Sequence, residues 1–364
     1  MIDFETSPVL EFGPFAEGIR LSGSPDEMGR TLGQLLVGSP GWQQLISPIT
    51  AYWTHRFPRL DSFLGEFGLE CQKGVNATGL EPRAFAALQL EHVFSVQTRS
   101  HFAFRSEEGQ LVHGVGLEGR SQPQLQWYHP KKGARCLLLA EPGQLGGLHG
   151  MNEHGLTVSV AFLQNPMRQI GEGLLPSLLV LKILSSATCL ADVLYRLRMT
   201  KPGCPLGVLT TSVAEDRISY TEWDGQTLAT MSRPPWVIAG NEQLMRRDAL
   251  GRPPQSMKFI ERLKPCRTNR DAIPNPQQIW ESLNTSSQST HPTTLWEPGV
   301  PRLRHSLLKE FHTREICSNW GDDGRPTQPA IRKPIRVCQS SESPLLEPVS
   351  TQQQREGTRI QAAF

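Results

Sequence analysis

The first part of the chain has hydrophobic residues at helical spacing. From Gly23 it reads GSPDEMGRTLGQLL, in which Ser24 or Asp26 can cap a helix. A second helical stretch covers 41–66, and a third, 81–97, opens with Glu81-Pro82, a favourable helix start. The apolar positions with this spacing are Met28, Leu32, Leu35, Leu36, Trp42, Leu45, Ile46, Ile49, Trp53, Phe57, Phe85, Leu88, Leu90, Val93 and Phe94. The pattern predicts a mostly helical region over residues 1–97.

After about residue 97, the spacing of the hydrophobic residues changes from that of a helix to that of a β-strand. Residues 100–104 and 110–118, separated by the turn residues 107–109, predict a β-hairpin. Helices are predicted from Pro176 and after the candidate cap Thr188. Further strands are predicted over 135–140, 155–163, 207–213, 217–223, 226–231 and 236–239. Asp224-Gly225 is a hairpin-turn pair between the fourth and fifth of these strands, and the last leads to Gly240-Asn241.

The C-terminal part of the chain, residues 284–364, is different in character. Eleven of the 29 prolines lie in the last hundred residues, and stretches such as SSQSTHPTT and STQQQREG contain few apolar residues. Most of 284–364 is therefore expected to be poorly ordered or marginally packed. Genuine divergence, or a shift of reading frame in the coding sequence, would each explain the change.

Composition excludes several classes of protein. The 37 Lys and Arg residues nearly balance the 35 Asp and Glu residues, so no basic excess indicates a nucleic-acid partner. The longest apolar stretch, Leu174–Leu184, is interrupted by Pro176, Ser177 and Lys182, so no membrane partner is expected. The seven cysteines form no CxxC pair, and the N-terminus does not resemble a signal peptide, so a reducing cytoplasm is expected. No Walker A motif, GxSxG elbow or dinucleotide fingerprint occurs, and we expect no cofactor and no metal.

Three stretches together resemble a known family. GSPDEMGRTLG resembles the N-terminal motif of the acyl-CoA:6-aminopenicillanic-acid acyltransferase (isopenicillin N acyltransferase) family. PGQLGGLHGMNEHGLTVSV resembles its glycine-rich loop and following strand, and the equivalent loop of bile salt (choloylglycine) hydrolases. The hairpin 100–118, followed far downstream by Asn241, has the expected order, and the resemblance covers roughly residues 23–262.

The resemblance implies a fold and a domain order. It implies an α+β N-terminal-nucleophile (Ntn) hydrolase fold, a four-layer αββα sandwich behind a helical pro-segment. The chain would then consist of a pro-segment-like region at 1–97, the Ntn-type domain at 98–283, and the C-terminal region at 284–364. The implied activity is that of an amidohydrolase or acyltransferase on linear amide (C–N) bonds of a small molecule, with self-processing.

In this family a cysteine opens the first strand of the hairpin and becomes the new N-terminus. No cysteine lies between residues 72 and 135. An ungapped match anchored on Gly114 gives Ser100 as the nucleophile, whereas a match anchored on Phe102 gives Arg99, which could not act. Thr98 is a third candidate by chemistry. A Ser100 freed by cleavage after Arg99 would carry its own base, an α-amino group with a pKa suited to neutral pH.

Two further residues complete the implied catalytic group. Glu118 ends the second strand of the hairpin, where we expect it beside Ser100 and able to orient the α-ammonium group. Asn241 matches the family's strand-end Asn, whose amide would donate to the oxyanion. Several departures accompany these matches. Gly116 and Glu118 stand where the family usually has Asn and Asp, Val115 replaces a frequent Arg, and Glu242 replaces a frequent His. A further family Asn falls near Ala161 or Phe162, and neither of these residues is polar. A catalytically inactive homologue that keeps the fold as a ligand- or partner-binding module is therefore the alternative.

Simpler interpretations accompany each candidate. Ser100 would be a strand-edge serine, Glu118 a solvated charge, and Asn241 an ordinary turn residue. Asn152 and Gly155 are expected to be structural, because Asn and Gly suit turns. His149 and His154 lack the spacing of a zinc site, His101 is expected on the sheet face opposite to Ser100, and Cys71 is expected to be a small buried hydrophobe.

Overall fold

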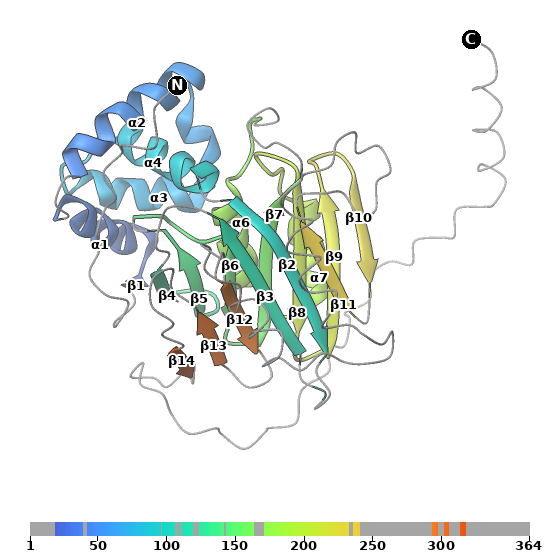
Figure 1. Ribbon diagram of the computed structural model, residues 1–364. Coiled ribbons are helices and arrows are strands. Elements are labelled where there is room, and N and C mark those ends of the chain that lie inside the picture. The colour runs from blue at the N-terminus through green and yellow to red at the C-terminus, as the bar shows by residue number, and fades with distance from the viewer. Residues whose placement is uncertain are drawn as a thin grey trace, which may run out of the picture. The chain divides into compact units, whose positions relative to one another are not determined.

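The structure of the chain is a computed structural model. It describes residues 19–38, 42–95, 97–105, 109, 111–118, 124–141, 143–163, 171–232, 236–240, 293–297, 302–305 and 314–317, which belong to one of the chain's two units, Met1–Ile331. At Ser100, Glu118 and several other positions only the backbone is described. The described residues form a mixed α/β fold built on two sheets (Figure 1).

The larger sheet has eight strands among the described residues, in the order β1-β4-β5-β6-β7-β8-β9-β10. Their bounds are β1 Ile19–Gly23, β4 Gln124–Pro130, β5 Cys136–Ala140, β6 His149–Asn152, β7 Leu156–Phe162, β8 Leu206–Ser212, β9 Arg217–Trp223 and β10 Leu228–Ser232. All neighbours are antiparallel except β1 and β4, which are parallel. The predicted turn between β9 and β10 is confirmed: the Asp224 carboxylate accepts from the amides of Gln226 and Thr227, and Gly225 has a φ of 91°.

The smaller sheet has six described strands, in the order β11-β2-β3-β12-β13-β14. Their bounds are β2 Gln97–Arg105, β3 Leu111–Glu118, β11 Trp236–Gly240, β12 Thr293–Glu297, β13 Arg302–His305 and β14 Arg314–Cys317. β2 and β3 form the predicted hairpin. β12, β13 and β14 lie within 284–364, where the sequence led us to expect poor order; the rest of that segment is outside the described residues.

The two sheets pack face to face, and helices cover the other face of the larger sheet. Figure 1 shows β2 and β3 crossing in front of β7 and β8, with α6 (Pro176–Ser186) and α7 (Leu190–Arg198) behind the sheet. Between the sheets lies a small apolar cluster formed by Ala103, Leu111, Leu209, Ile218, Tyr220, Val237 and Ala239. Leu179, Val180, Ile183 and Leu184 of α6 are buried in the large core on the opposite side of the larger sheet. The full four-layer arrangement and the pro-segment stay predictions.

In the described part of the chain before β2 there are four helices and a short 3-10 turn. They are α1 (Pro25–Val37), α2 (Trp42–Arg56), η2 (Leu60–Phe63), α3 (Gly65–Asn76) and α4 (Pro82–Ser95). The patterns at 23–36 and 81–97 predicted α1 and α4, whereas α3 extends well beyond the predicted stretch 41–66. α1 and α3 can approach closely because glycines lie at their contact. A methyl group at Gly29 would overlap the Cys71 carbonyl oxygen, and one at Gly74 would overlap the Asp26 carbonyl oxygen.

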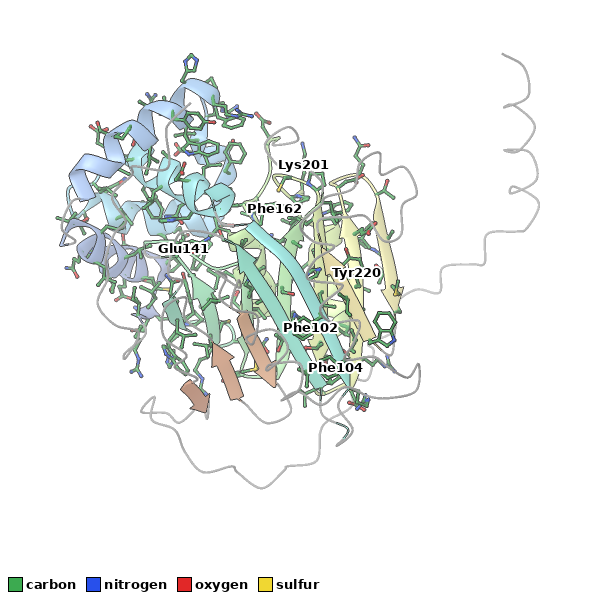
Figure 2. The ribbon with its side chains drawn as sticks, in the orientation of Figure 1. Phe102, Phe104, Glu141, Phe162, Lys201 and Tyr220 are labelled. Carbon is green, nitrogen blue, oxygen red and sulfur yellow. The ribbon has the colours of Figure 1, made fainter. Side chains whose placement is uncertain are left out.

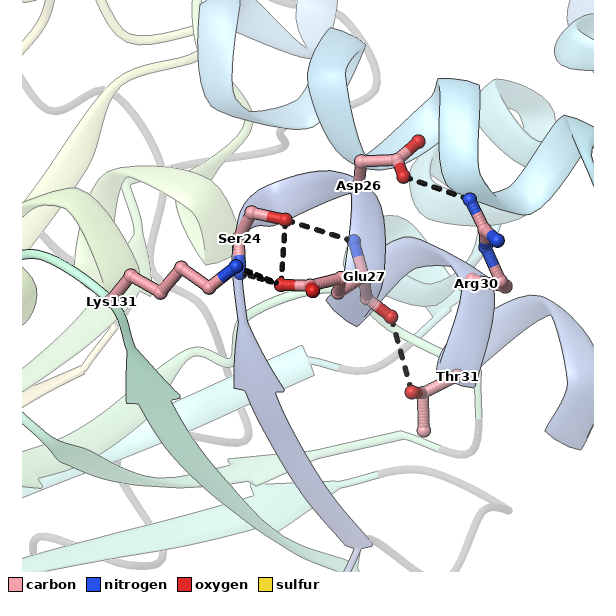
Figure 3. A network of polar contacts seen from close by, with 6 residues as sticks. All are labelled: Ser24, Asp26, Glu27, Arg30, Thr31 and Lys131. Carbon is pink, nitrogen blue, oxygen red and sulfur yellow. Dashed lines mark hydrogen bonds and ion pairs between the residues drawn. The ribbon is translucent and has the colours of Figure 1, made fainter.

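The start of α1 is held by a network of polar contacts (Figure 3). Ser24 is the N-cap: its hydroxyl accepts from the Glu27 amide at 3.4 Å, and the Glu27 carboxylate accepts from the Ser24 amide at 2.7 Å. Lys131, after β4, pairs with Glu27 at 2.8 Å, and these donors hold the pKa of Glu27 at about 2. The motif that resembled the family's N-terminal signature is thus, in part, a capping box.

Candidate active site

The strands that carry the three candidate residues are neighbours in the smaller sheet. Ser100 on β2 pairs with Gly116 on β3 on one side and with Gly240, the last residue of β11, on the other. Asn241 directly follows Gly240 in the sequence but lies outside the described residues. The backbone therefore brings Ser100 beside the strand end that precedes Asn241.

The register of the hairpin differs from the expected one. β2 begins at Gln97, so Ser100 does not open the strand, and Glu118 pairs with Gln97 instead of Ser100. The reason is the position of the turn: Arg105 opposes Leu111, and counting back from that pair places Ser100 opposite Gly116.

An irregularity interrupts the hairpin at the expected cleavage point. Thr98 pairs with Leu117 and Ser100 with Gly116, so the register shifts between Thr98 and Ser100, and Arg99 is the extra residue. A bulge of this kind locally breaks the hydrogen-bonded ladder. Both residues that could act as the nucleophile, Thr98 and Ser100, thus lie next to the bulge.

Behind β2 and β3, a chain of polar side chains joins the two sheets. The Ser159 hydroxyl on β7 lies 3.0 Å from His101 Nδ1 and 2.7 Å from His113 Nε2. His113 Nδ1 in turn lies 3.2 Å from the Thr211 hydroxyl on β8. All four side chains are buried. We call His101, Ser159, His113 and Thr211 the inter-sheet chain.

The inter-sheet chain has a preferred direction of donation. One hydroxyl hydrogen at Ser159 can serve only one of the two imidazoles, so the other imidazole must donate to it. His101 Nε2 has no hydrogen-bond partner among the described residues. A buried unpaired acceptor costs less than a buried unpaired N–H. His101 Nδ1–H donating to Ser159, and Ser159 donating to His113 Nε2, is therefore the favoured arrangement.

Burial keeps these imidazoles neutral. Desolvation lowers the pKa of His101 to about 3 and holds the pKa of His113 well below its usual value, with a smaller contribution from neighbouring His101 and His149. His149 on β6 pairs with Ser159 in the sheet, and desolvation lowers its pKa to about 3 as well. Among the described residues, no group of three or more His, Cys, Asp or Glu side chains is arranged to hold a metal ion.

The glycine-rich loop is tightly packed. Methyl groups at Gly143, Gly146 and Gly147 would overlap Leu36, the Ser177 carbonyl oxygen and the Leu139 carbonyl oxygen, respectively. Buried Gln89 on α4 donates to the Gly143 carbonyl at 3.0 Å and accepts from the Leu145 amide at 2.7 Å. This loop, which is part of the stretch that resembles the family, therefore joins α4 to the larger sheet, and its glycines permit close packing.

Asn152 has the structural role that the sequence predicted. Its amide nitrogen donates to the carbonyls of Leu184 and Ala187 at the end of α6, at 2.9 and 2.8 Å. Its amide oxygen accepts from the backbone N–H groups of His154 and Leu156, both at 3.1 Å. Gly155 in the same turn has a φ of 74°, as expected.

Three of the described cysteines are not candidates for a nucleophile, because burial suppresses their reactivity. Cys71, Cys136, Cys189 and Cys204 are buried. Burial raises the pKa of Cys71, Cys136 and Cys204, so their reactive thiolate form is suppressed. Cys71 is a buried hydrophobe as predicted.

Sequence reasoning missed the inter-sheet chain. His101 was considered only as a base for Ser100 and set aside because alternation places it on the other face; the structure places its ring between the sheets, against Tyr220 at 5.6 Å. Figure 2 shows Phe102 and Phe104 on β2 below Tyr220 in this view. The available signal was the position of His101 and His113 next to apolar residues that are buried in the structure, at 102–104 on β2 and at 111, 112 and 115 on β3.

Comparison with known proteins gives distant likenesses only. No family model and no curated protein matches the chain. Among solved structures, a Caenorhabditis elegans N-acylethanolamine-hydrolyzing acid amidase (NAAA) ortholog is 13% identical with a TM-score of 0.41, covering 56% of this chain and 94% of that one. A variant of conjugated bile acid hydrolase from Clostridium perfringens is 12% identical with a TM-score of 0.43, and the match covers 60% of this chain and 92% of that one. Penicillin V acylase from Agrobacterium tumefaciens is 10% identical with a TM-score of 0.39, and the match covers 60% of this chain and 86% of that one. At TM-scores below 0.5, these likenesses do not assign an activity to the chain.

Proposed function

We propose that the chain is an Ntn-type amidohydrolase or acyltransferase that acts on the linear amide bond of a small molecule. Ser100 is the nucleophile, Glu118 orients its α-ammonium group, and Asn241 donates to the oxyanion. The observation that carries this proposal is the pairing of Ser100 with Gly116 and Gly240, because it makes the strands that bear or precede the three residues neighbours. The sequence resemblance supplies the roles.

Self-processing is the first step of the proposed mechanism. The Ser100 hydroxyl attacks the Arg99 carbonyl carbon, and the acyl group moves from the Ser100 nitrogen to its oxygen. Water then hydrolyses the ester, leaving a carboxylate on Arg99 and a free α-amine on Ser100. The register shift next to Ser100 favours this position, because a bulged peptide is not held by the regular ladder.

The mature site would then work with its own amine as base. The Ser100 amine takes the hydroxyl proton as the oxygen attacks the substrate amide carbon, and it returns the proton to the leaving nitrogen. The Asn241 amide stabilises the oxyanion of the tetrahedral intermediate. Water, or an acceptor amine in an acyltransferase, releases the acyl group from Ser100.

The intact mass of the purified full chain under denaturing conditions tests this proposal. Cleavage yields two fragments, one of which begins at Ser100, and Ser100→Ala abolishes cleavage. Thr98→Ala is the matched control, since it removes a neighbouring hydroxyl beside the same bulge and leaves cleavage after Arg99 unchanged. If Ser100→Ala left both self-cleavage and amidase activity unchanged, the assignment of Ser100 would be wrong.

The alternative, an inactive homologue that binds a ligand or partner, has support of its own. Polar residues of the family are replaced by apolar ones at or near Val115, Ala161 and Phe162. All three side chains are fully or almost fully buried, so these positions supply no polar group to a site. A single uncut chain of 40.6 kDa, with no acyl-enzyme ester after incubation with amide substrates, supports this alternative. An ester on any residue excludes it.

A further inference from the structure

The solvent-facing side of α7 carries exposed apolar side chains among cations. Met199 and Tyr195, with 67% and 56% of their surface exposed, are the most exposed large hydrophobic residues among those described. Residues four apart lie on the same side of a helix, so the two side chains are neighbours. Leu190, Val193 and Leu197 are buried on the opposite side of α7, which fixes the orientation of the helix. We call Lys182, Tyr195, Arg196, Arg198, Met199 and Lys201 the α7 surface.

The cations of the α7 surface have no carboxylate partner in the described part of the chain. Arg30, Arg105, Lys131 and Arg135 each form an ion pair with an Asp or Glu. By contrast, Arg196 stacks over the Tyr195 ring, with Cζ 5.7 Å from the ring centroid, and Lys182 donates to the Thr200 hydroxyl at 3.0 Å. Arg198 and Lys201 are exposed.

The acidic groups around α7 are engaged elsewhere. Asp192 and Glu215 are at the N-terminal end of the helix, where they accept from the Thr188 and Leu190 amides at 2.8 and 2.6 Å. Asp224 lies next to Gly225, which approaches the Lys201 side chain, but its carboxylate accepts from two turn amides. Positive charge is therefore concentrated at the C-terminal end of α7. Part of this charge stabilises the helix dipole, but that interaction does not require Tyr195 and Met199 to be exposed.

We infer that the α7 surface binds the surface of an anionic phospholipid bilayer. Lys and Arg side chains extend to lipid phosphates while their stems cover apolar groups, and an aromatic ring and a thioether enter the interface between headgroups and acyl chains. Two apolar side chains are few for a stable protein interface, which buries about 1,200–2,000 Å². Four cations are enough for weak electrostatic attachment to an anionic leaflet. Such attachment needs no spanning helix, and none of the described helices is long and apolar enough to cross a bilayer.

Vesicle co-sedimentation of the full chain tests this inference. The protein should bind vesicles of phosphatidylcholine with phosphatidylserine, should not bind phosphatidylcholine alone, and should be released by salt. Arg198→Gln should lower the partition coefficient about fivefold, the equivalent of about 1 kcal/mol for one cation near an anionic surface. Met199→Ser should also weaken binding, through the loss of its apolar contact.

Lys132→Gln is the matched control, because Lys132 is an exposed cation in the turn between β4 and β5 and its replacement changes the net charge equally. It should leave binding unchanged. Absence of binding to the phosphatidylserine vesicles at low salt would overturn the inference, as would an equal loss in Lys132→Gln and Arg198→Gln. Retention on polyglutamate beads without vesicle binding would also overturn it, since this would indicate an acidic protein partner.

Discussion

The His113 imidazole on β3 and the Ser159 hydroxyl on β7 are joined by a 2.7 Å hydrogen bond that crosses from one sheet to the other. His101, on the neighbouring strand β2, reaches the same hydroxyl at 3.0 Å. Both strands of the hairpin that carries Ser100 and Glu118 thus form a hydrogen bond to the same Ser159 hydroxyl of the opposite sheet. The inter-sheet chain therefore fixes where the hairpin lies, whichever function the hairpin performs.

The first prediction concerns acid stability. His101 and His149 have a pKa of about 3 in the folded chain, against about 6.5 when unfolded, and burial lowers the pKa of His113 likewise. Between these two values the unfolded state binds more protons, so the free energy of unfolding falls as the pH falls from about 6.5 to about 3. Each imidazole contributes a slope of about 1.4 kcal/mol per pH unit. Urea unfolding at a series of pH values measures this slope.

A pair of histidine variants assigns the slope to its source. His101→Gln should reduce it by about 1.4 kcal/mol per pH unit, since one buried imidazole is removed. His55→Gln should leave it unchanged, because His55 is exposed on α2. Equal slopes in the wild-type chain and His101→Gln would show that His101 titrates normally in the folded state.

The second prediction concerns the hydroxyl shared by the two imidazoles. Ser159→Ala should lower the free energy of unfolding by about 1–3 kcal/mol, because it leaves polar atoms of His101 and His113 buried without a partner. Ser186→Ala on α6 removes an exposed hydroxyl and should change stability by less than about 0.5 kcal/mol. Chemical denaturation measures both values, and similar small changes in the two variants would contradict the described network.

Much of the secondary structure could be predicted from local patterns. α1, α4, α6 and α7 have apolar residues at helical spacing, and β9 and β10 flank a recognisable turn. The predicted starts of α1, α4 and α6 agree with the structure, whereas α7 begins after Cys189 and Thr188 does not cap it. β1 was missed because its partner, β4, lies about a hundred residues further along, and five residues give no local signal. α3 was missed in part because Gly65, Gly68 and Gly74 lower its helix propensity, although Gly74 is what allows close contact with α1.

The candidate site shows the same division between local and non-local information. The hairpin of β2 and β3 was predicted from the sequence, but its register depends on the exact position of the turn. The bulge at Arg99 could not be predicted, because no residue pattern indicates it. The inter-sheet chain joins residues 46, 58 and 98 positions apart. A polar contact of that kind depends on how two sheets stack, which no local pattern encodes.

The third prediction concerns the structural role of Asn152. Asn152→Ala removes hydrogen bonds to four backbone groups and should cost about 3 kcal/mol or more in the free energy of unfolding. Asn152→Asp keeps the acceptor for the amides of His154 and Leu156 but places an oxygen against the carbonyls of Leu184 and Ala187. It should therefore also be destabilised. An Asn152→Asp variant with unchanged stability would show that the contact with the end of α6 does not form.

The fourth prediction concerns the contact between α1 and α3. Alanine has a higher helix propensity than glycine by about 1 kcal/mol, so Gly29→Ala would stabilise α1 if nothing lay against it. Because the new methyl group would overlap the Cys71 carbonyl oxygen, we expect a loss of about 3 kcal/mol instead. Gly171→Ala is the control, since no atom lies within 4 Å of the added carbon and its φ is not in the left-handed region. Thermal or urea unfolding measures both variants. A more stable Gly29→Ala chain would mean that α1 and α3 do not pack through this glycine.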